Sequence, residues 1–371
     1  MVNKKTRIFR NGQIIMENNQ AKKRKQNRKA LFILLVFIGV FSLFIYMIVK
    51  PSLESTAINE ISTCLNTEDV KSIFYKYRTD LIESQEFCQA ARDKLNSFNL
   101  SQSEIVDIKK WLPSKTSNLN VIVVPDLSNR IIDNENNPDQ IKRDSVIINA
   151  ISESFINSVK TKMNSNDKLI IDITDRKQAG GKIGELADTI MYDVSNFKDK
   201  INKLYFNDKK EQFRSGVNKL YTAAYDFEIK NPKGGGADFV SYFSTNLKSK
   251  IQKSTLDDNY RNVLIILTDG YLEATKPNGD VVSYIKIKPT DILETTNSRF
   301  KDLEVYLLEF NRRKKANDIE ENNIKRWWYE WLKSMNVKSI DDETGEDGVI
   351  LKRMHGYTDV KKRVDEILNK K

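Results

Sequence analysis

The stretch VIVVPDLSNRI, residues 121–131, leads four apolar residues and a proline into three polar side chains, Asp126, Ser128 and Arg130. A short run of Val and Ile with no polar residue in it is typical of a buried parallel strand, because helices cover both faces of such a sheet. The polar residues would then follow the carboxyl end of the strand. Open sheets of this kind bind ligands beyond the carboxyl ends of their strands, which makes Asp126 and Ser128 candidate site residues.

Similar apolar runs recur along the chain and indicate the fold class. They are KLIIDI (168–173), NVLIILTD (262–269) and LEVYLLEF (303–310), with amphipathic stretches at 144–163 and 239–252. Strands that alternate with helices predict an α/β fold with an open, doubly wound, mostly parallel sheet. We expect this domain to extend over residues 118–371.

A second strand end carries polar residues of the same kind. The segment LTDGY (267–271) places Asp269 just past an apolar run. Because the carboxyl ends of parallel strands meet at one edge of a sheet, we expect Asp269 to lie near Asp126 and Ser128. Two carboxylates and a hydroxyl suit a hard divalent cation such as Mg²⁺ or Mn²⁺, which prefers oxygen ligands. The three residues are therefore candidate metal ligands.

The order of these segments resembles the von Willebrand factor type A domain. It runs apolar strand, DLS, amphipathic helix, strand, GGGADF (234–239), helix and VLIILTDGY (263–271), so that the resemblance covers residues 119–371. That family has a metal-ion-dependent adhesion site, written D-x-S-x-S, then a Thr from a later loop and an Asp in a TDG-like turn. The resemblance implies that Asp126, Ser128 and Asp269 hold an ion whose coordination is completed by an acidic residue of a partner protein. It implies protein–protein interaction, and no enzyme.

Two motif positions depart from the family. Arg130 stands where the second Ser is expected, and Ala237 stands where Thr is frequent, followed by Asp238. Asp238 could partly replace the Thr, so it is a weaker candidate ligand. Arg130 could instead take the electrostatic role of the ion, because an Arg fork pairs with carboxylates bidentately. In that alternative the fold is metal-free, and recognition uses the surrounding loops, which could still favour an acidic group.

Two further functions stay open. Asp172 and Asp175 add two acids near the same edge, which fits a metal-dependent hydrolase, although His355 is the only histidine available to share the work. The other function is a metal-free structural component of an envelope assembly, with the Trp-rich segment 324–335 as its contact surface. A core helix is the preferred interpretation of that segment, because its apolar residues share one side at helical spacing.

The positive charge of the chain is concentrated at its start. Residues 1–29 carry ten Lys or Arg and one acid, which leaves 51 basic and 50 acidic residues for the remainder. The near-neutral remainder gives no reason to expect a nucleic-acid partner. The tail is followed by the uncharged run LFILLVFIGVFSLFIYMIV (31–49). A helix of this length can cross a hydrocarbon core of roughly 30 Å.

These features predict a single-pass protein of the cell membrane. Residues 1–29 would be a cytoplasmic tail and residues 30–50 a transmembrane helix in the lipid bilayer. By the positive-inside rule, the larger C-terminal part would be exported, into the periplasm if the cell is Gram-negative. A cleaved signal peptide is the alternative, but the apolar run is longer than the usual h-region of about 7–15 residues.

Residues 51–117 predict a short helical stalk. A helix is expected from Thr67, and Ser101 with Glu104 has the spacing of a capping box. The two cysteines of the chain, Cys64 and Cys88, both lie in this segment. An oxidising, exported location would permit a disulfide between them, and two free thiols are the alternative.

Overall fold

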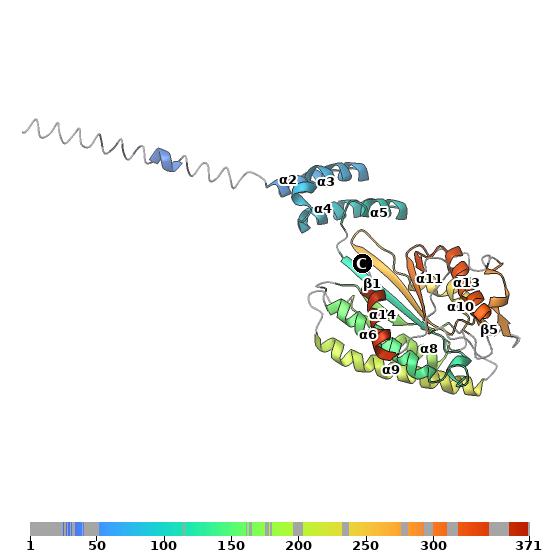
Figure 1. Cartoon of the computed structure of the whole chain (residues 1–371). Coiled ribbons are helices and arrows are strands. Elements are labelled where there is room, and N and C mark those ends of the chain that lie inside the picture. The colour runs from blue at the N-terminus through green and yellow to red at the C-terminus, as the bar shows by residue number, and fades with distance from the viewer. Residues whose placement is uncertain are drawn as a thin grey trace, which may run out of the picture. The chain divides into compact units, whose positions relative to one another are not determined.

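The computed structural model divides the chain into two compact units, Met1–Val106 and Asp107–Lys371 (Figure 1). It describes residues 25, 27, 29, 31, 34–38, 40, 52–113, 116–160, 162, 165–174, 178, 180–195, 203–231, 237–275, 281–289, 291–292, 300–309, 318–340 and 356–369. The second unit begins ahead of the predicted boundary at residue 118. Lys109, at the end of α5 (Gln102–Lys109), already belongs to it, since its Nζ lies 3.3 Å from Oδ1 of Asn259.

The described part of the first unit is helical. Its helices are α2 (Leu53–Ser62), α3 (Thr67–Leu81), α4 (Gln85–Asn96) and the first turns of α5. As predicted, a helix starts at Thr67, and Ser101 and Glu104 form a capping box in which Glu104 accepts from the Ser101 backbone N–H at 2.8 Å. Phe74 stacks on Phe87 with ring centroids 5.1 Å apart, which gives the three-helix cluster an aromatic centre.

The two cysteines of this unit are buried and free. Cys64 donates to the carbonyl of Glu60 at 3.5 Å, and Cys88 donates to the carbonyl of Ile82 at 3.4 Å. The structure therefore contains the alternative with two thiols and not the disulfide. Burial raises the pKa of both thiols, which keeps them protonated at neutral pH.

The prediction of a single-pass membrane protein is corrected by the structure. A bilayer-crossing helix needs about 20 consecutive apolar residues. Within the described residues, no helix is long and apolar enough to cross a membrane. Of the predicted span 30–50, the structure describes 31, 34–38 and 40, and the other positions lie outside the described residues, as do residues 1–24 of the tail.

The second unit is an α/β fold built on a mostly parallel sheet of six strands in the order β3-β2-β1-β4-β7-β8. The strands are β1 (Thr116–Pro125), β2 (Lys168–Ile171), β3 (Met191–Asp193), β4 (Asp258–Leu267), β7 (Leu303–Leu308) and β8 (Ser339–Ile340). Only β3 runs antiparallel to its neighbour. A separate hairpin pairs β5 (Glu273–Thr275) with β6 (Val281–Ser283).

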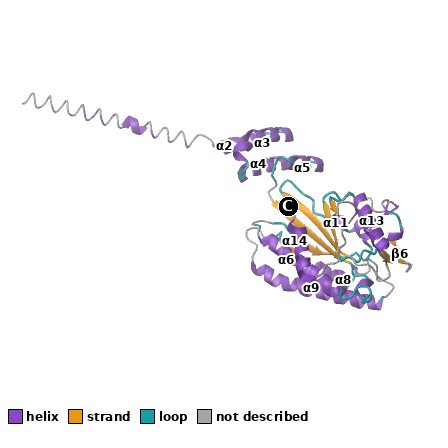
Figure 2. Cartoon of the chain, in the orientation of Figure 1, coloured by secondary structure: helices purple, strands orange, loops and turns teal. Residues whose placement is uncertain are grey.

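Helices cover both faces of this sheet (Figures 1 and 2). Along β1 the side chains alternate, so that Val121 and Val123 pack into one core cluster and Ile122 and Val124 into the other. The first cluster is completed by α6 (Gln140–Lys160), α8 (Lys182–Thr189), α9 (Lys203–Lys230) and α14 (Gly356–Asn369). The second is completed by α10 (Phe239–Thr245), α11 (Leu247–Lys250) and α13 (Asp318–Ser334). Burial on both faces explains why the strands read as continuous apolar runs.

The end of α14 is held to the sheet by Arg261. Its guanidinium donates to the carbonyls of Ile367 and Leu368 at 2.6 and 3.0 Å and to Oε2 of Glu304 on the neighbouring strand at 2.6 Å. Burial by itself would raise the pKa of Glu304, but the hydrogen bonds and charge of Arg261 and the charge of Lys338 outweigh it and lower the pKa below 4.5. The carboxylate is therefore more acidic in the folded chain than in the unfolded one.

We expect Glu304→Gln to destabilise this unit by about 2 kcal/mol near pH 7, the range for a hydrogen bond to a charged group. A lowered carboxyl pKa stabilises the fold above the unfolded value, and this contribution is lost as the pH falls through the folded value. The difference between wild type and variant should therefore shrink towards about pH 3. Urea unfolding followed by Trp fluorescence measures it, because all four tryptophans, at 111, 327, 328 and 331, lie in this unit.

Glu330→Gln is the matched control, because Glu330 is exposed on α13. It should change the unfolding free energy by less than about 0.5 kcal/mol at either pH. An equal loss for Glu304→Gln at both pH values would contradict the ionic role of Glu304.

Candidate functional site

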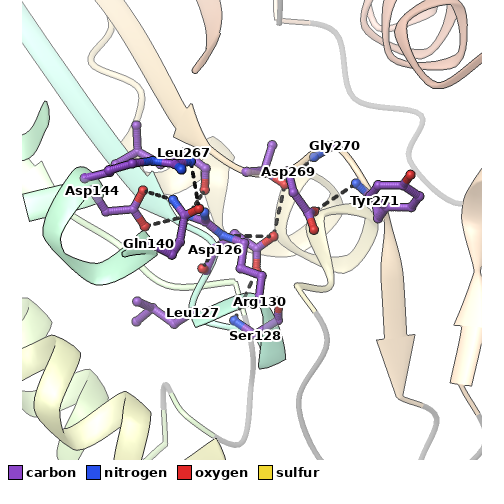
Figure 3. A network of polar contacts seen from close by, with 12 residues as sticks. Asp126, Leu127, Ser128, Arg130, Gln140, Asp144, Leu267, Asp269, Gly270 and Tyr271 are labelled. Carbon is purple, nitrogen blue, oxygen red and sulfur yellow. Dashed lines mark hydrogen bonds and ion pairs between the residues drawn. The ribbon is translucent and has the colours of Figure 1, made fainter. Parts of the chain in front are cut away.

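The candidate site lies between β1 and β4, the point at which the order of the strands in the sheet changes direction. From β1 the chain builds outward through β2 and β3, and from β4 it builds outward on the other side through β7 and β8. Asp126 directly follows β1, and Asp269 lies two residues beyond β4. Because β1 and β4 are parallel neighbours, with Pro125 opposite Leu267, both acids come to the carboxyl edge at this switch point (Figure 3). Ligands of open α/β sheets bind at such points.

Asp126 is almost completely buried, and both of its carboxylate oxygens are engaged. Its Oδ1 accepts the backbone N–H of Ser128 at 3.1 Å, and its Oδ2 accepts the hydroxyl of Thr268 at 3.0 Å. The side chain of Ser128 is half-buried. Thr268 is a site residue that the sequence reasoning missed, although it stands directly before Asp269 in the LTDGY segment.

Asp269 lies in a tight turn that is held in place by a hydrogen bond from α13. Its Oδ1 accepts the backbone N–H of Tyr271 at 3.1 Å, and Gly270 has a φ of 91°, a left-handed conformation that favours glycine. The indole of Trp328 on α13 donates to the carbonyl of Gly270 at 3.0 Å. The turn that carries Asp269 is thus fixed by the core helix behind it.

Arg130 joins the two strand ends to each other. It belongs to the short 3₁₀ helix η1 (Asn129–Ile131), and only 2% of it is exposed. Its Nε donates to the backbone carbonyl of Asp126 at 2.8 Å, and its Nη2 donates to the carbonyl of Leu267 at 2.9 Å. Its Nε also lies 3.6 Å from Oδ2 of Asp126. One guanidinium therefore connects the residue that follows β1 with the last residue of β4.

The main charge partner of Arg130 is Asp144 on α6. The two lie 2.6 Å apart, and Asp144 also accepts hydrogen bonds from Gln140 at 2.7 Å and Tyr221 at 2.9 Å. Burial raises the pKa of Asp144 to about 6, against the opposing effects of Arg130, Tyr221 and Gln140. Burial by itself would lower the pKa of Arg130, but the charges of Asp144 and Asp126 raise it above its usual value. At neutral pH the buried pair is therefore ionised.

The sequence reasoning also missed Asp144, although it carries a signal. Asp144 stands at i with Ile147, Ile148 and Ile151 at i+3, i+4 and i+7, so an acid lies on the apolar face of the predicted helix. A carboxylate at a core position needs a cation or several donors. The same helix extends the polar network to the end of β7, because Arg143 bonds Oε1 of Gln140 at 3.0 Å and Oε2 of Glu309.

The structure thus brings together Asp126, Ser128, Arg130 and Asp269 and leaves Asp238 in another role. Asp238 is the N-cap of α10 and accepts the backbone N–H of Ser241 at 2.9 Å.

Asp172, one of the acids considered as a catalytic group, has partners outside this cluster. Asp172 accepts the hydroxyl of Tyr242 at 2.9 Å and lies 3.6 Å from Nζ of Lys250. Asp175 and His355 lie outside the described residues.

A divalent ion does not fit this arrangement while Arg130 is charged and in place. The fixed guanidinium lies 3.6 Å from Oδ2 of Asp126. Its Nη1 is buried and has no hydrogen-bond partner among the described residues, and an unused donor suits an acceptor and not a cation. Across the described ranges, no group of three His, Cys, Asp or Glu side chains could hold a metal. Of the predicted Mg²⁺ or Mn²⁺ ligands, Asp126, Ser128 and Asp269 come to one edge of the sheet, whereas Asp238 caps α10.

We expect Arg130→Met to cost about 3–5 kcal/mol of unfolding free energy, because it leaves the buried Asp144 without its charge partner. The double variant Arg130→Met/Asp144→Leu should be more stable than the sum of the single effects predicts, with a coupling of about 2 kcal/mol. Urea unfolding followed by Trp fluorescence measures both quantities. Arg326→Met, an exposed arginine on α13, is the control, and strictly additive single effects would argue against the pair.

Comparison with known proteins adds no family for this chain. No family model and no curated protein matches it. Among solved structures it is similar to a pilus adhesin, SpaC, from Lactobacillus rhamnosus GG, with 10% sequence identity and a TM-score of 0.38. The match covers 68% of this chain and 30% of the adhesin chain. A similarity of this size carries no argument about fold or function.

Proposed function

We propose that residues 107–371 form a protein-interaction module similar to the von Willebrand factor type A domain, with no catalytic role. One observation carries this proposal: the acids of the two polar strand ends, Asp126 and Asp269, meet at the switch point of the sheet. The strand order supports the doubly wound topology of the proposal. Numbered along the chain, the six strands lie in the order third, second, first, fourth, fifth, sixth, a common order of doubly wound sheets.

The loops at this edge offer the contact surface. Between β1 and α6 the chain makes a connection in which Asn129, Asn134 and Glu135 are exposed, while Asp126 and Arg130 beneath them are buried. Binding residues are frequently carried by loops on a rigid scaffold, and the polar network below holds this loop on the sheet. The partner would therefore contact the loop and not the buried charges.

This arrangement removes the reason to expect an acidic group on the partner. The charge of Arg130 is directed to Asp144 at 2.6 Å, and the guanidinium is buried. A partner carboxylate at the surface would gain little from it. Specificity would come from the exposed polar groups of the loop.

The alternative functions receive less support from the geometry. In the structural-component alternative the Trp-rich helix was the contact surface, but Trp328 and Trp331 are fully buried and Trp327 is 5% exposed. The core-helix interpretation of that segment is thereby confirmed. The hydrolase alternative relied on Asp172 and Asp175. Asp172 is paired with Tyr242 and Lys250, and Asp175 lies outside the described residues.

Site-specific photo-crosslinking in the source cells tests the proposed module. A photoreactive amino acid at Asn129 or Glu135 should capture one protein reproducibly, because both positions are exposed at the proposed contact edge. The same probe at Lys253, which is exposed shortly before β4 and hence at the amino edge of the sheet, is the matched control. Equal capture from all three positions, or no capture from the loop, would contradict a partner site at the carboxyl edge.

A further inference from the structure

The buried carboxylate of Asp126 must be compensated by a positive charge or by hydrogen-bond donors. A buried carboxylate needs a cation or a full set of donors, because removing it from water is costly. Asp126 is 1% exposed and receives two neutral donors, Ser128 and Thr268. The positive charge beside it is the guanidinium of Arg130, with Nε at 3.6 Å. The carboxylate at the centre of the candidate site therefore has a cation that belongs to the chain itself.

The guanidinium of Arg130 also binds groups other than the carboxylate. It donates to the carbonyl oxygens of Asp126 and Leu267, the groups that end the two central strands. A set of carbonyl and carboxylate oxygens is also what a hard cation would coordinate at this junction. Arg130 satisfies the same kinds of oxygen with N–H groups and so links both halves of the sheet without an ion.

The side chain of Arg130 is held in its position beside Asp126 by Asp144. Asp144, which is 0% exposed, holds Nη2 at 2.6 Å and is itself held by Gln140 and Tyr221. Withdrawing the guanidinium would leave the buried Asp144 without its cation, which is unfavourable whether the carboxylate stays charged or takes up a proton. A divalent ion next to Asp126 would have to share this space with a fixed positive charge, and the two would repel each other.

We propose that Arg130 is a resident cation that takes the place of a divalent ion at this site, with Asp144 as the positioning residue that keeps it there. The positive charge beside Asp126 is then independent of the metal concentration around the site. This inference goes beyond the proposed function, because it depends on the geometry of the site and not on any partner.

Calorimetric titration of Mg²⁺ and Mn²⁺ into the full chain tests the inference. The wild type should show no saturable binding up to about 10 mM, which is above the dissociation constants of weak hard-cation sites, about 0.1–1 mM. The double variant Arg130→Met/Asp144→Leu removes both charges together and so avoids a lone buried carboxylate. It should bind with a dissociation constant at least about tenfold below that limit. Adding Asp126→Ala to the double variant should abolish the gain.

Arg130→Lys is the matched control, because it keeps the positive charge but loses the planar fork. It should bind neither Mg²⁺ nor Mn²⁺. This result would show that the positive charge, which Lys keeps, excludes the ion, and that the shape of the guanidinium fork, which Lys loses, is not needed for it. Saturable binding by the wild type that disappears in Asp126→Ala would overturn the inference. A double variant that is folded by circular dichroism and binds no ion would overturn it as well. Neither outcome depends on photo-crosslinking at the loop, so the two proposals fail separately.

Discussion

The buried contact between Arg130 and Asp144 is the interaction on which the carboxyl edge of the sheet depends. A guanidinium and a carboxylate 2.6 Å apart attract strongly in a medium from which water is excluded. The pair is costly to bury, and it persists because the remaining donors and acceptors are largely engaged. Through it, the first helix after β1 is joined to the ends of both central strands. Arg130 belongs to η1 and contacts both Asp126 and Asp144, so the end of β1, the turn of η1 and α6 are connected at this point.

The carboxyl edge of the sheet is polar, and its acidic side chains are bonded to other groups of the chain. Four neighbouring strands, β2, β1, β4 and β7, are each followed within two residues by an acid: Asp172, Asp126, Asp269 and Glu309. In the contacts described above these carboxylates accept from the chain itself: from Tyr242, from Thr268, from the backbone of Tyr271 and from Arg143. An edge whose acids accept hydrogen bonds from the chain itself has less need of an external cation. It presents loops to its surroundings, with the charges beneath them.

The central strands of the sheet could be predicted from the sequence, and the two edge strands could not. The runs at 121, 168, 262 and 303 all became strands, because each is buried on both faces and its apolar character is visible without a partner. The edge strands β3 and β8 have three and two residues, too few for a pattern, and they exist through pairing with their neighbours. The uncharged run at 31–49 and the basic residues before it predicted a membrane span, but none of the described helices is long and apolar enough to cross a membrane.

The candidate site was predictable in its positions but not in its contacts. Strand ends are marked by the change from apolar to polar residues, so Asp126 and Asp269 could be placed at one edge. The role of Arg130 depends on Asp144, fourteen residues away on a helix, and on Tyr221 further along the chain. Such pairings arise from tertiary packing, which motif spacing does not contain. Asp238 failed as a site residue for a local reason, because a helix start beside it uses its carboxylate as a cap.

The pairing of β1 with β4 also has a consequence for how the chain acquires its structure. The hydrogen bond from Arg130 to Leu267 spans 137 positions of sequence. Contacts of such long range form slowly, because a large loop must close before they contribute. During synthesis, the first strand and its polar turn leave the ribosome long before β4 exists. Until then the guanidinium lacks the carbonyl of Leu267, one of its three hydrogen-bond acceptors, so the junction is completed late, when the second half of the sheet arrives.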